Sequence, residues 1–459
     1  MSVKQNQWNL FDTEACTRCG ECFHKCPEMS LPLEIAKQEI NALIDGQDSK
    51  HVLYHCTTCF SCNLICPHDC KPYELILQRW NELYWKRGAP PIYRFVCPTM
   101  ESNIWQMLEV LMPEDEKVEV QKWMNQDLKE EVLLIGNYTH LFSFIIGNSK
   151  LLDYFTPVDL LDQWECGAYL YQGGYLDVVK EIGKNCKSTF DSHGVKTVVP
   201  FLDAVQYMID TIHSKEMDVK FNQKIINFNK WILDKIENGD LIFQKKLDFK
   251  VTIHDNCYSK ADGGLYWNTA RDLIKKTGCE IIEMEHIKEN ALCCGFGAGA
   301  SWKNKNRIVF DILAGAKRKY EEAEATGADA IVTYCGGCLY LLWAANELFS
   351  SNLKVFHSIE LVRMALGEKI DINQKMHKKR AWDIITIISY HIFKGLSKDP
   401  FRIEDLEFTE EKWKQKKFRF LRFMRWCFRS RVIQFLFRKI FGFLLPRMKT
   451  KREWENDGE

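Results

Sequence analysis

The sequence lacks a net charge, a secretory leader, a membrane-spanning run and a nucleotide-binding loop. Its 62 basic and 62 acidic residues cancel, which excludes a global attraction to nucleic acid or to an anionic surface. Residues 1–15 have no basic start followed by an apolar stretch, so we expect no secretory signal. Residues 132–149 carry no charge, but their glycines, asparagines and histidine favour a strand-loop-helix over a transmembrane helix. No GxGxxG motif follows a predicted strand, so we expect any flavin chemistry to come from another chain.

Cysteine, in contrast, is abundant. A chain of 459 residues with 46% hydrophobic residues can form two or three domain cores without disulfide cross-links. Most of its 19 cysteines fall in tight CxxC runs, which suit metals better than disulfides. We therefore expect a reducing compartment, by default the cytoplasm.

The first 70 residues contain two CxxCxxCxxxCP quartets. The first is Cys16, Cys19, Cys22 and Cys26, and the second is Cys56, Cys59, Cys62 and Cys66. Three cysteines at two-residue gaps can wrap three corners of a 4Fe-4S cluster, and the cysteine before proline reaches the neighbouring cluster. We therefore predict one cluster on Cys16, Cys19, Cys22 and Cys66, and another on Cys56, Cys59, Cys62 and Cys26. Zinc is the alternative, but zinc sites usually come as CxxC pairs.

Apolar spacing predicts helices over residues 33–43 and 73–85 of this segment. Cys70 is one thiol more than the pattern needs. The segment resembles the helical ferredoxin domain of succinate dehydrogenase iron–sulfur subunits and heterodisulfide reductases. That resemblance implies an all-α domain over residues 1–95 with two 4Fe-4S clusters.

Residues 130–370 alternate short β-rich runs with helical stretches, which predicts parallel sheets with covering helices. The expected strands are 132–135, 197–199, 250–254, 280–284 and 330–333, and the expected helices are 306–326 and 339–348.

Five cysteines follow predicted strands or lie in loops of the second half of this region. They are Cys257, Cys293, Cys294, Cys335 and Cys338. Because ligands of open α/β folds gather at the carboxyl ends of strands, these thiols could converge from three segments. A zinc site or a set of buried cysteines is the alternative.

These five cysteines resemble the cysteine-rich "CCG" domain of the heterodisulfide reductase superfamily, which includes iron–sulfur subunits of glycolate, lactate and glycerol-3-phosphate dehydrogenases. The resemblance implies that the five cysteines are catalytic and hold a third, non-cubane 4Fe-4S cluster. This chain departs from the family in Cys335-Gly336-Gly337-Cys338, where a proline more often follows the first cysteine.

The family usually carries this domain twice, and a degenerate first copy is visible. Residues 164–167 (WECG) lie where residues 292–295 (LCCG) lie in the second copy. Leu202 and Val205 stand roughly where Cys335 and Cys338 stand. We expect a degenerate repeat over residues 130–245 and a live one over 246–370. Cys166, Cys186 and Cys279 are then packed thiols, and no role is assigned to Cys97 or Cys427.

Three polar residues near the second copy have two interpretations. His254, His286 or Asp255 could donate a proton near the cluster, since histidine titrates near neutral pH. A residue held by hydrogen bonds at a strand end is the more ordinary interpretation.

Residues 412–452 contain 15 lysines and arginines and no acid, interleaved with aromatic residues. Arg422, Arg425 and Arg429 share one helical face, and an apolar face is formed by Leu421, Met424, Phe428, Val432 and Phe435. This pattern predicts a helix lying on a membrane surface, within an amphipathic tail over residues 380–459. A protein partner is the alternative. Residues 381–394 form a shorter apolar helix that could pack beneath it.

The sequence thus predicts an α+β multidomain protein: a helical ferredoxin domain, a duplicated α/β CCG region and an amphipathic helical tail. We expect an enzyme subunit that takes electrons from a flavoprotein partner and passes them to a membrane quinone at the cytoplasmic face. The alternatives are a disulfide reductase and a non-catalytic electron conduit. No nucleic acid partner is expected.

Overall fold

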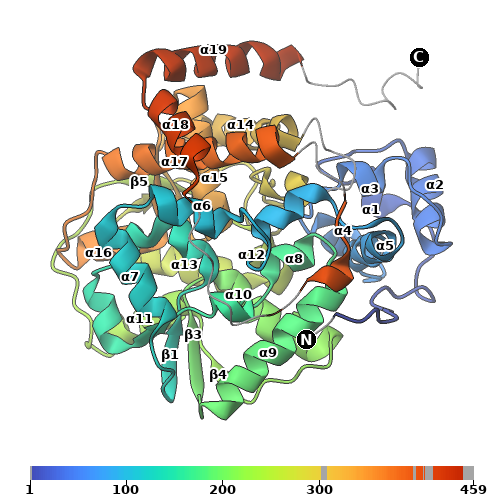
Figure 1. Cartoon of the computed structure of the whole chain (residues 1–459), viewed down its shortest axis with the longest axis horizontal. Coiled ribbons are helices and arrows are strands. Elements are labelled where there is room, and N and C mark those ends of the chain that lie inside the picture. The colour runs from blue at the N-terminus through green and yellow to red at the C-terminus, as the bar shows by residue number, and fades with distance from the viewer. Residues whose placement is uncertain (1–2, 301–307, 396–399, 407, 409–416, 448–459) are drawn as a thin grey trace.

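The computed structural model describes residues 3–300, 308–395, 400–406, 408 and 417–447, which are mostly helical and include two small parallel sheets (Figure 1). The N-terminal helices are α1 (Glu21–His24), α2 (Leu33–Ile44), α3 (Val52–His55), α4 (Ser61–Ile65) and α5 (Pro72–Arg87). The predicted helices over 33–43 and 73–85 are therefore confirmed as α2 and α5. Pro72 suits the first turn of α5, where a backbone N–H has no helical partner.

The two sheets have the same strand order and are wholly parallel. The first contains β1 (Glu131–Leu134), β2 (Thr156–Val158), β3 (Thr197–Pro200) and β4 (Lys224–Ile225), in the order β2-β1-β3-β4. The second contains β5 (Lys250–His254), β6 (Glu280–Ile281), β7 (Ala330–Thr333) and β8 (Lys354–His357), in the order β6-β5-β7-β8. This repeated topology is what a duplicated α/β unit would produce. The predicted strand 280–284 ends early, at Ile281.

Helices connect and cover these strands. In the first half they are α6 (Ile104–Leu111), α7 (Glu114–Met124), α8 (Ala168–Gln172), α9 (Leu176–Ser192), α10 (Asp203–Tyr207) and α11 (Phe228–Glu237). In the second half they are α12 (Cys257–Asp262), α13 (Gly264–Lys276), α14 (Ile308–Ala325), α15 (Gly336–Phe349) and α16 (Ser358–Ala365). The expected helices 306–326 and 339–348 correspond to α14 and α15; residues 306–307 lie outside the described residues.

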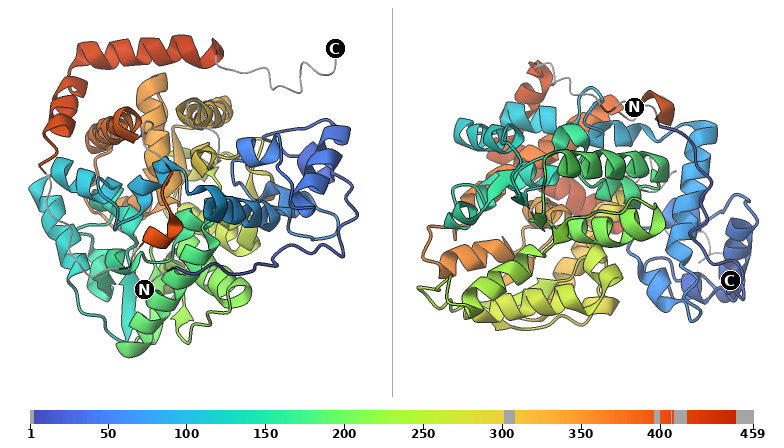
Figure 2. Two further views of the ribbon diagram at one scale, coloured as in Figure 1. Left: turned by 45° about the vertical axis from the view of Figure 1, so that its right-hand side comes forward. Right: turned by 90° about the horizontal axis from the view of Figure 1, so that it is seen from below.

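One contiguous hydrophobic core joins the N-terminal helices to both sheets. Buried Asp177 of α9 reinforces this junction. Its carboxylate accepts hydrogen bonds from Trp8 Nε1 (3.0 Å), Asn81 Nδ2 (2.7 Å) and Trp85 Nε1 (2.7 Å). The ferredoxin-like segment is therefore held against α9, a helix of the first half (Figure 2).

The tail forms two helices instead of one. α18 (Arg419–Phe428) packs on α17 (Lys375–Gly395), and α19 (Arg431–Arg447) runs along the top of the molecule in Figure 1. The expectation that 381–394 packs beneath the tail is confirmed by α17. No described helix is long and apolar enough to cross a membrane.

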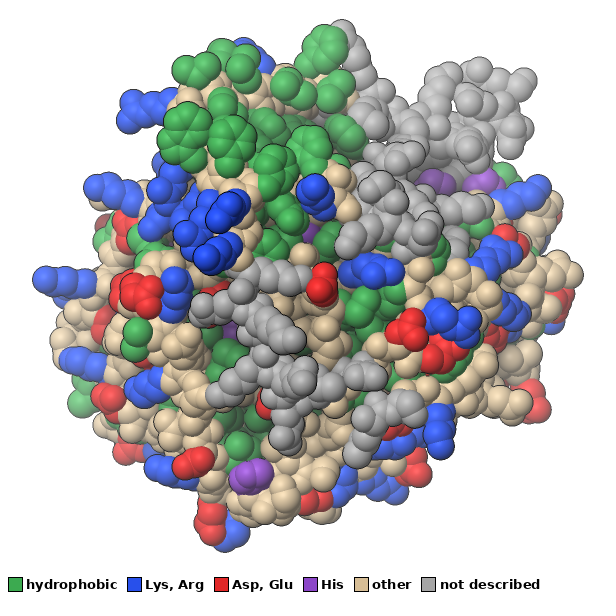
Figure 3. All heavy atoms as spheres, viewed as in Figure 1, with side chains coloured by type: hydrophobic (Ala, Val, Ile, Leu, Met, Phe, Trp, Pro, Cys, Tyr) green, Lys and Arg blue, Asp and Glu red, His purple; other side chains and the backbone are tan. Residues whose placement is uncertain are grey.

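The prediction that five apolar residues of the tail form one continuous face is wrong. Leu421, Met424 and Phe428 of α18 are buried, because they face the protein, whereas Val432 and Phe435 of α19 are exposed. Arg425 also turns inward and pairs with Asp383 of α17 (2.7 Å). The exposed apolar residues of α18 and α19 gather at the top of Figure 3. They are Phe420, Phe423, Trp426, Val432, Phe435, Leu436, Ile440 and Phe443, and are called the apolar tail patch below.

Candidate iron–sulfur centres and the cavity between the two halves

Cysteines of the two N-terminal quartets lie close to one another. Burial raises the pKa of the Cys22 thiol, and Cys66, Cys19 and Cys16 raise it further. Burial raises the pKa of the Cys26 thiol to about 12, and Cys59 of the other quartet contributes to the increase. Cys56 in turn neighbours Cys59 and Cys26. Each cysteine before proline thus lies close to thiols of the other loop, as the predicted crossed ligand sets require.

Backbone amides point at several of these sulfurs. Arg18 N–H donates to Cys16 Sγ (3.4 Å), Thr58 N–H to Cys56 Sγ (3.4 Å), and Cys70 N–H to Cys66 Sγ (3.5 Å). Hydrogen bonds to sulfur favour thiolate and tune the potential of iron–sulfur clusters. The donor set and its surroundings therefore fit two iron–sulfur clusters. Cys70, the spare thiol, is buried beside Cys66 and Cys16.

The five cysteines of the second half line one cavity. Cys257, Cys293, Cys294, Cys335 and Cys338 all contribute to its wall. Cys257 follows β5 and Cys335 follows β7, so the carboxyl ends of these parallel strands bring distant segments together. Cys294 Sγ lies 3.4 Å from Cys338 Sγ, and Gln172 Nε2 donates to Cys257 Sγ (3.0 Å).

Glycines let the cysteine loop pack this closely. A Cβ at Gly295 would lie 2.2 Å from the carbonyl oxygen of Ile312, and Gly295 has a φ of 95°. The Gly295 N–H also donates to Cys293 Sγ (3.3 Å). Thiols that converge at glycine-rich turns fit a further cluster, whose binding would displace their protons.

The first half closes the cavity with a different set of side chains. Glu165, Cys166, Leu202 and Val205 line it opposite the thiols, with the aromatic residue Trp164 beside them. Leu202 and Val205 offer no ligand atom, in accord with a degenerate copy. Buried Cys166 lies on the cavity wall, whereas buried Cys186 and Cys279 are not among the lining residues.

His254 lies close to two of the thiols, whereas His286 and Asp255 form ion pairs with residues outside the cavity lining. His254 is buried at the end of β5, and a ring nitrogen lies within 4.8 Å of the sulfurs of Cys294 and Cys338. His286 Nδ1 instead pairs with Glu322 of α14 (2.5 Å).

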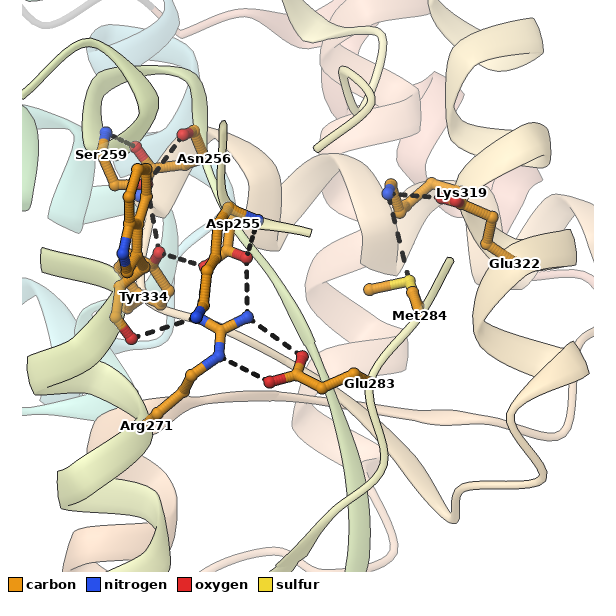
Figure 4. Close-up of polar contacts among 11 residues, drawn as sticks. Asp255, Asn256, Ser259, Arg271, Glu283, Met284, Lys319, Glu322 and Tyr334 are labelled. Carbon is orange, nitrogen blue, oxygen red and sulfur yellow. Dashed lines mark hydrogen bonds and ion pairs between the residues drawn. The ribbon is translucent and has the colours of Figure 1, made fainter. Parts of the chain in front are cut away.

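Asp255 belongs to a buried polar cluster beside the strand ends (Figure 4). It pairs with Arg271 (2.8 Å) and accepts a hydrogen bond from Tyr334 Oη (2.7 Å), and Arg271 also pairs with Glu283 (2.6 Å). The Arg271 hydrogen bonds hold the pKa of Asp255 below its ordinary value despite the opposing effect of burial. The carboxylate therefore supports the fold, as the more ordinary interpretation expected.

The second quartet lies directly against the cysteine loop of the cavity. A Cβ at Gly297 would lie 2.0 Å from the carbonyl oxygen of Thr57, so only glycine allows this approach. Cys293 Sγ lies 3.9 Å from the same oxygen. Lys260, 2% exposed, donates to Ser61 Oγ (2.6 Å) and to the Ala291 carbonyl (2.8 Å), so it bridges the two ligand loops.

Sequence reasoning missed Lys260, Gln172 and Glu165. A lysine or glutamine outside any motif carries no signal of its own, since it becomes a site residue only through tertiary packing. Glu165 did carry a signal, because its motif aligns it with Cys293, but the alignment alone indicates only that a ligand is missing.

Two family models match the chain at these sites. The 4Fe-4S dicluster domain matches residues 9–67, and the cysteine-rich (CCG) domain matches residues 251–342. The chain is therefore an iron–sulfur protein that combines these two domains. The dicluster domain implies two four-iron clusters, and the cysteine-rich domain indicates a further one.

The chain is also similar in sequence to several curated oxidoreductases and oxidoreductase subunits. It is 25% identical over 213 residues to a subunit of the dihydromethanophenazine:CoB–CoM heterodisulfide reductase of Methanosarcina acetivorans, covering 46% of this chain and 51% of that one. It is 24% identical over 177 residues to the EtfAB:quinone oxidoreductase of Syntrophomonas wolfei, covering 38% and 23%. It is 25% identical over 203 residues to the probable iron-sulfur-binding oxidoreductase FadF of Bacillus subtilis, covering 43% and 27%.

The chain is thus a distant homologue of heterodisulfide reductase subunits and iron–sulfur oxidoreductases. It spans about half the length of the heterodisulfide reductase chain it matches, and about a quarter of the other two.

Proposed function

We propose that this protein is an iron–sulfur oxidoreductase subunit that passes electrons from a redox partner through two 4Fe-4S clusters to a third, non-cubane cluster and on to a membrane quinone. The clusters would supply one-electron storage and transfer. Their proposed ligands are the crossed quartets of the N-terminal segment and the five cysteines of the cavity.

The contact between the second quartet and the cavity loop is the observation that carries this proposal. Thr57 touches Gly297, and Lys260 joins Ser61 to Ala291, with no intervening layer of protein. Electron transfer between two centres is faster the less protein lies between them, so this contact favours it. The dicluster segment of this chain is thus suited to feed the cavity without a further carrier.

The tail supports a membrane-bound acceptor. Its basic residues suit anionic lipids, and its apolar patch suits the acyl boundary. The patch is also structurally linked to the cavity. Phe408, between α17 and α18, contacts Trp164 of the cavity wall at a ring distance of 4.5 Å, and α6, which carries the lining residue Trp105, contacts α18. We infer that the chain works at the cytoplasmic face of a membrane, with a flavoprotein as donor.

Reduction of a disulfide is the second candidate. The five thiols share a cavity with space beyond them, and a heterodisulfide reductase chain is a relative. A non-catalytic conduit is the third candidate. Titration with a small thiol separates disulfide reduction from the other two functions. A disulfide reductase should change its paramagnetic signal, and Cys257→Ser should abolish that change, whereas a quinone reductase or a conduit should not respond.

Metal analysis tests the proposal itself. The protein purified without oxygen should hold about twelve irons, four for each of three clusters. Cys293→Ser should remove one cluster signal and spare two, and Cys166→Ser serves as the matched control on the opposite wall, with unchanged iron. Zinc in place of iron at either cysteine set would refute the proposal.

A further inference from the structure

The cavity has two unlike walls. The second half contributes five thiols, whereas the first half contributes the carboxyl groups of Glu165 and Asp203. Glu165 occupies the position in its repeat that Cys293 occupies in the other, and the glycine two residues on has a positive φ in both copies, 71° at Gly167 and 95° at Gly295. The loops are therefore similar in backbone, and a carboxyl group stands where the live copy has a thiol.

Glu165 is buried and forms no salt bridge with any residue that the structure describes. Its side chain is 3% exposed; Oε2 accepts a hydrogen bond from Asn137 N–H (3.0 Å), and Oε1 has no hydrogen-bond partner among the described residues. Burial, aided by the charge of Asp159, raises the pKa of Glu165 to about 8. The free oxygen therefore carries a proton at neutral pH.

The backbone around Glu165 is also unusual. Trp164 and Glu165 have φ values of 62° and 53°, a left-handed conformation that costs a non-glycine residue free energy. Two such residues in succession at a cavity wall are typical of functional sites. A residue that only filled space here would not need a buried, unpaired carboxyl oxygen, which itself destabilises the fold.

We propose that Glu165 donates a proton to a quinone bound in the cavity, and this inference rests on the proposed function. The quinone accepts two electrons from the reduced redox partner and two protons. The O–H bond of Glu165 breaks as an O–H bond forms at one quinone carbonyl oxygen. Asp203 supplies the second proton to the other oxygen, and water protonates both carboxylates again after the hydroquinone leaves.

Asp203 fits this second role. It is buried on the same wall, and Asn227 Nδ2 donates to its Oδ1 (3.3 Å), while Oδ2 has no hydrogen-bond partner among the described residues. Burial raises the pKa of Asp203 to about 7. The two unpaired carboxyl oxygens give this wall one proton for each quinone oxygen.

Glu165→Gln tests the donor, because the amide oxygen can still accept the Asn137 hydrogen bond. Glu74→Gln is the matched control: Glu74 is buried, its pKa is also raised to about 8 by burial, and it is not among the lining residues of the cavity. The protein carrying its clusters is reduced by an artificial dye without oxygen and mixed with a water-soluble short-chain quinone. We expect Glu165→Gln to slow quinone reduction at least tenfold, with unchanged iron content, paramagnetic signals and quinone affinity, and Glu74→Gln to match the natural protein.

The pH profile provides a readout that a structural role would not change. The groups facing Glu165 are Asp159, Tyr138, Cys166 and Cys186, with His140 paired to Asp159. Burial raises the pKa of the tyrosine and both thiols, so they stay neutral up to pH 8. The rate of the natural protein should therefore fall as pH rises through about 7, where Asp203 loses its proton, and again through about 8, where Glu165 does. In Glu165→Gln the fall near 8 should be absent, whereas the fall near 7 should remain.

The outcomes are distinguishable. Quinone reduction by Glu165→Gln at the natural rate would overturn the role of Glu165 and leave the proposed function standing. If the natural protein with its clusters reduces no quinone, the proposed function itself fails, and the proton donor with it.

Discussion

Replacing Lys260 with methionine should lower the reduction potential of the cluster held by the second quartet. Lys260 is buried, and its ammonium donates to Ser61 Oγ (2.6 Å), which lies 3.3 Å from Cys59 Sγ. No carboxylate pairs with it among the described residues. Its positive charge therefore stabilises the reduced, more negative state of a cluster bound by Cys59.

The size of the effect follows from these distances. The two contacts place the ammonium within about 6 Å of the Cys59 sulfur, where a unit charge contributes ~3 kcal/mol at an effective dielectric constant of about 20. That energy corresponds to ~120 mV for a one-electron couple. Relaxation and water entry reduce it, so we expect a decrease of roughly 50–100 mV.

Redox titration followed by paramagnetic resonance measures this change. Lys260→Arg is the control, because it keeps the charge and the donors, and it should stay within ~20 mV of the natural protein. The iron content of both variants should be unchanged. An unchanged potential in Lys260→Met, with iron retained, would refute the idea that this lysine sets the potential at the junction.

Three further predictions concern the rest of the chain. Deleting residues 412–459 should move the protein from vesicles of anionic lipid to the supernatant with its iron intact, and retention on the vesicles would place the membrane anchor elsewhere. Phe435→Asp in the apolar tail patch should weaken vesicle binding more than Arg425→Gln, because Phe435 is exposed whereas Arg425 is paired with Asp383. Asp177→Ala should lower stability by about 3–5 kcal/mol, since it leaves the buried donor of Asn81 and the partly buried donors of Trp8 and Trp85 without an acceptor. Limited proteolysis should then release the N-terminal segment. Glu74→Gln should flatten the pH dependence of thermal stability. A carboxyl group whose folded pKa is raised to about 8 stabilises the fold at low pH, and that stability is lost as pH rises from about 4.5 to 8. An unchanged profile would show that Glu74 does not titrate in this range.

Local patterns in the sequence predicted most of the architecture. The cysteine spacing indicated two crossed quartets, and alternation of strand-like and helical runs predicted parallel sheets. Strands 250–254 and 330–333 were predicted with their observed bounds, because β-branched and apolar residues there are flanked by turns. The tail was predicted less well, since helical periodicity does not reveal the bend at Arg429 and Ser430 or which apolar residues α17 would cover.

The remaining features depend on packing between segments distant in sequence. Lys260 contacts Ser61 from 199 positions away, and Gln172 contacts Cys257 from 85 positions away. A local sequence pattern spans only a few residues, so it cannot contain both partners of either contact. The cavity itself has the same origin, because its two walls come from the two sheets and no motif describes the space between them.

The duplicated topology explains why loss of ligands in one half need not abolish function. In both sheets the loops that follow the first and third strands, β1 and β3 or β5 and β7, reach the same cavity. The first half therefore shapes the cavity even though it lacks the five-cysteine set. A second cluster there would fill this space and offer only another electron carrier. Apolar and carboxylic side chains instead leave room for an acceptor and protons for its reduction. The second half would then supply electrons and the first half protons, and a quinone needs both because its reduction takes two electrons and two protons.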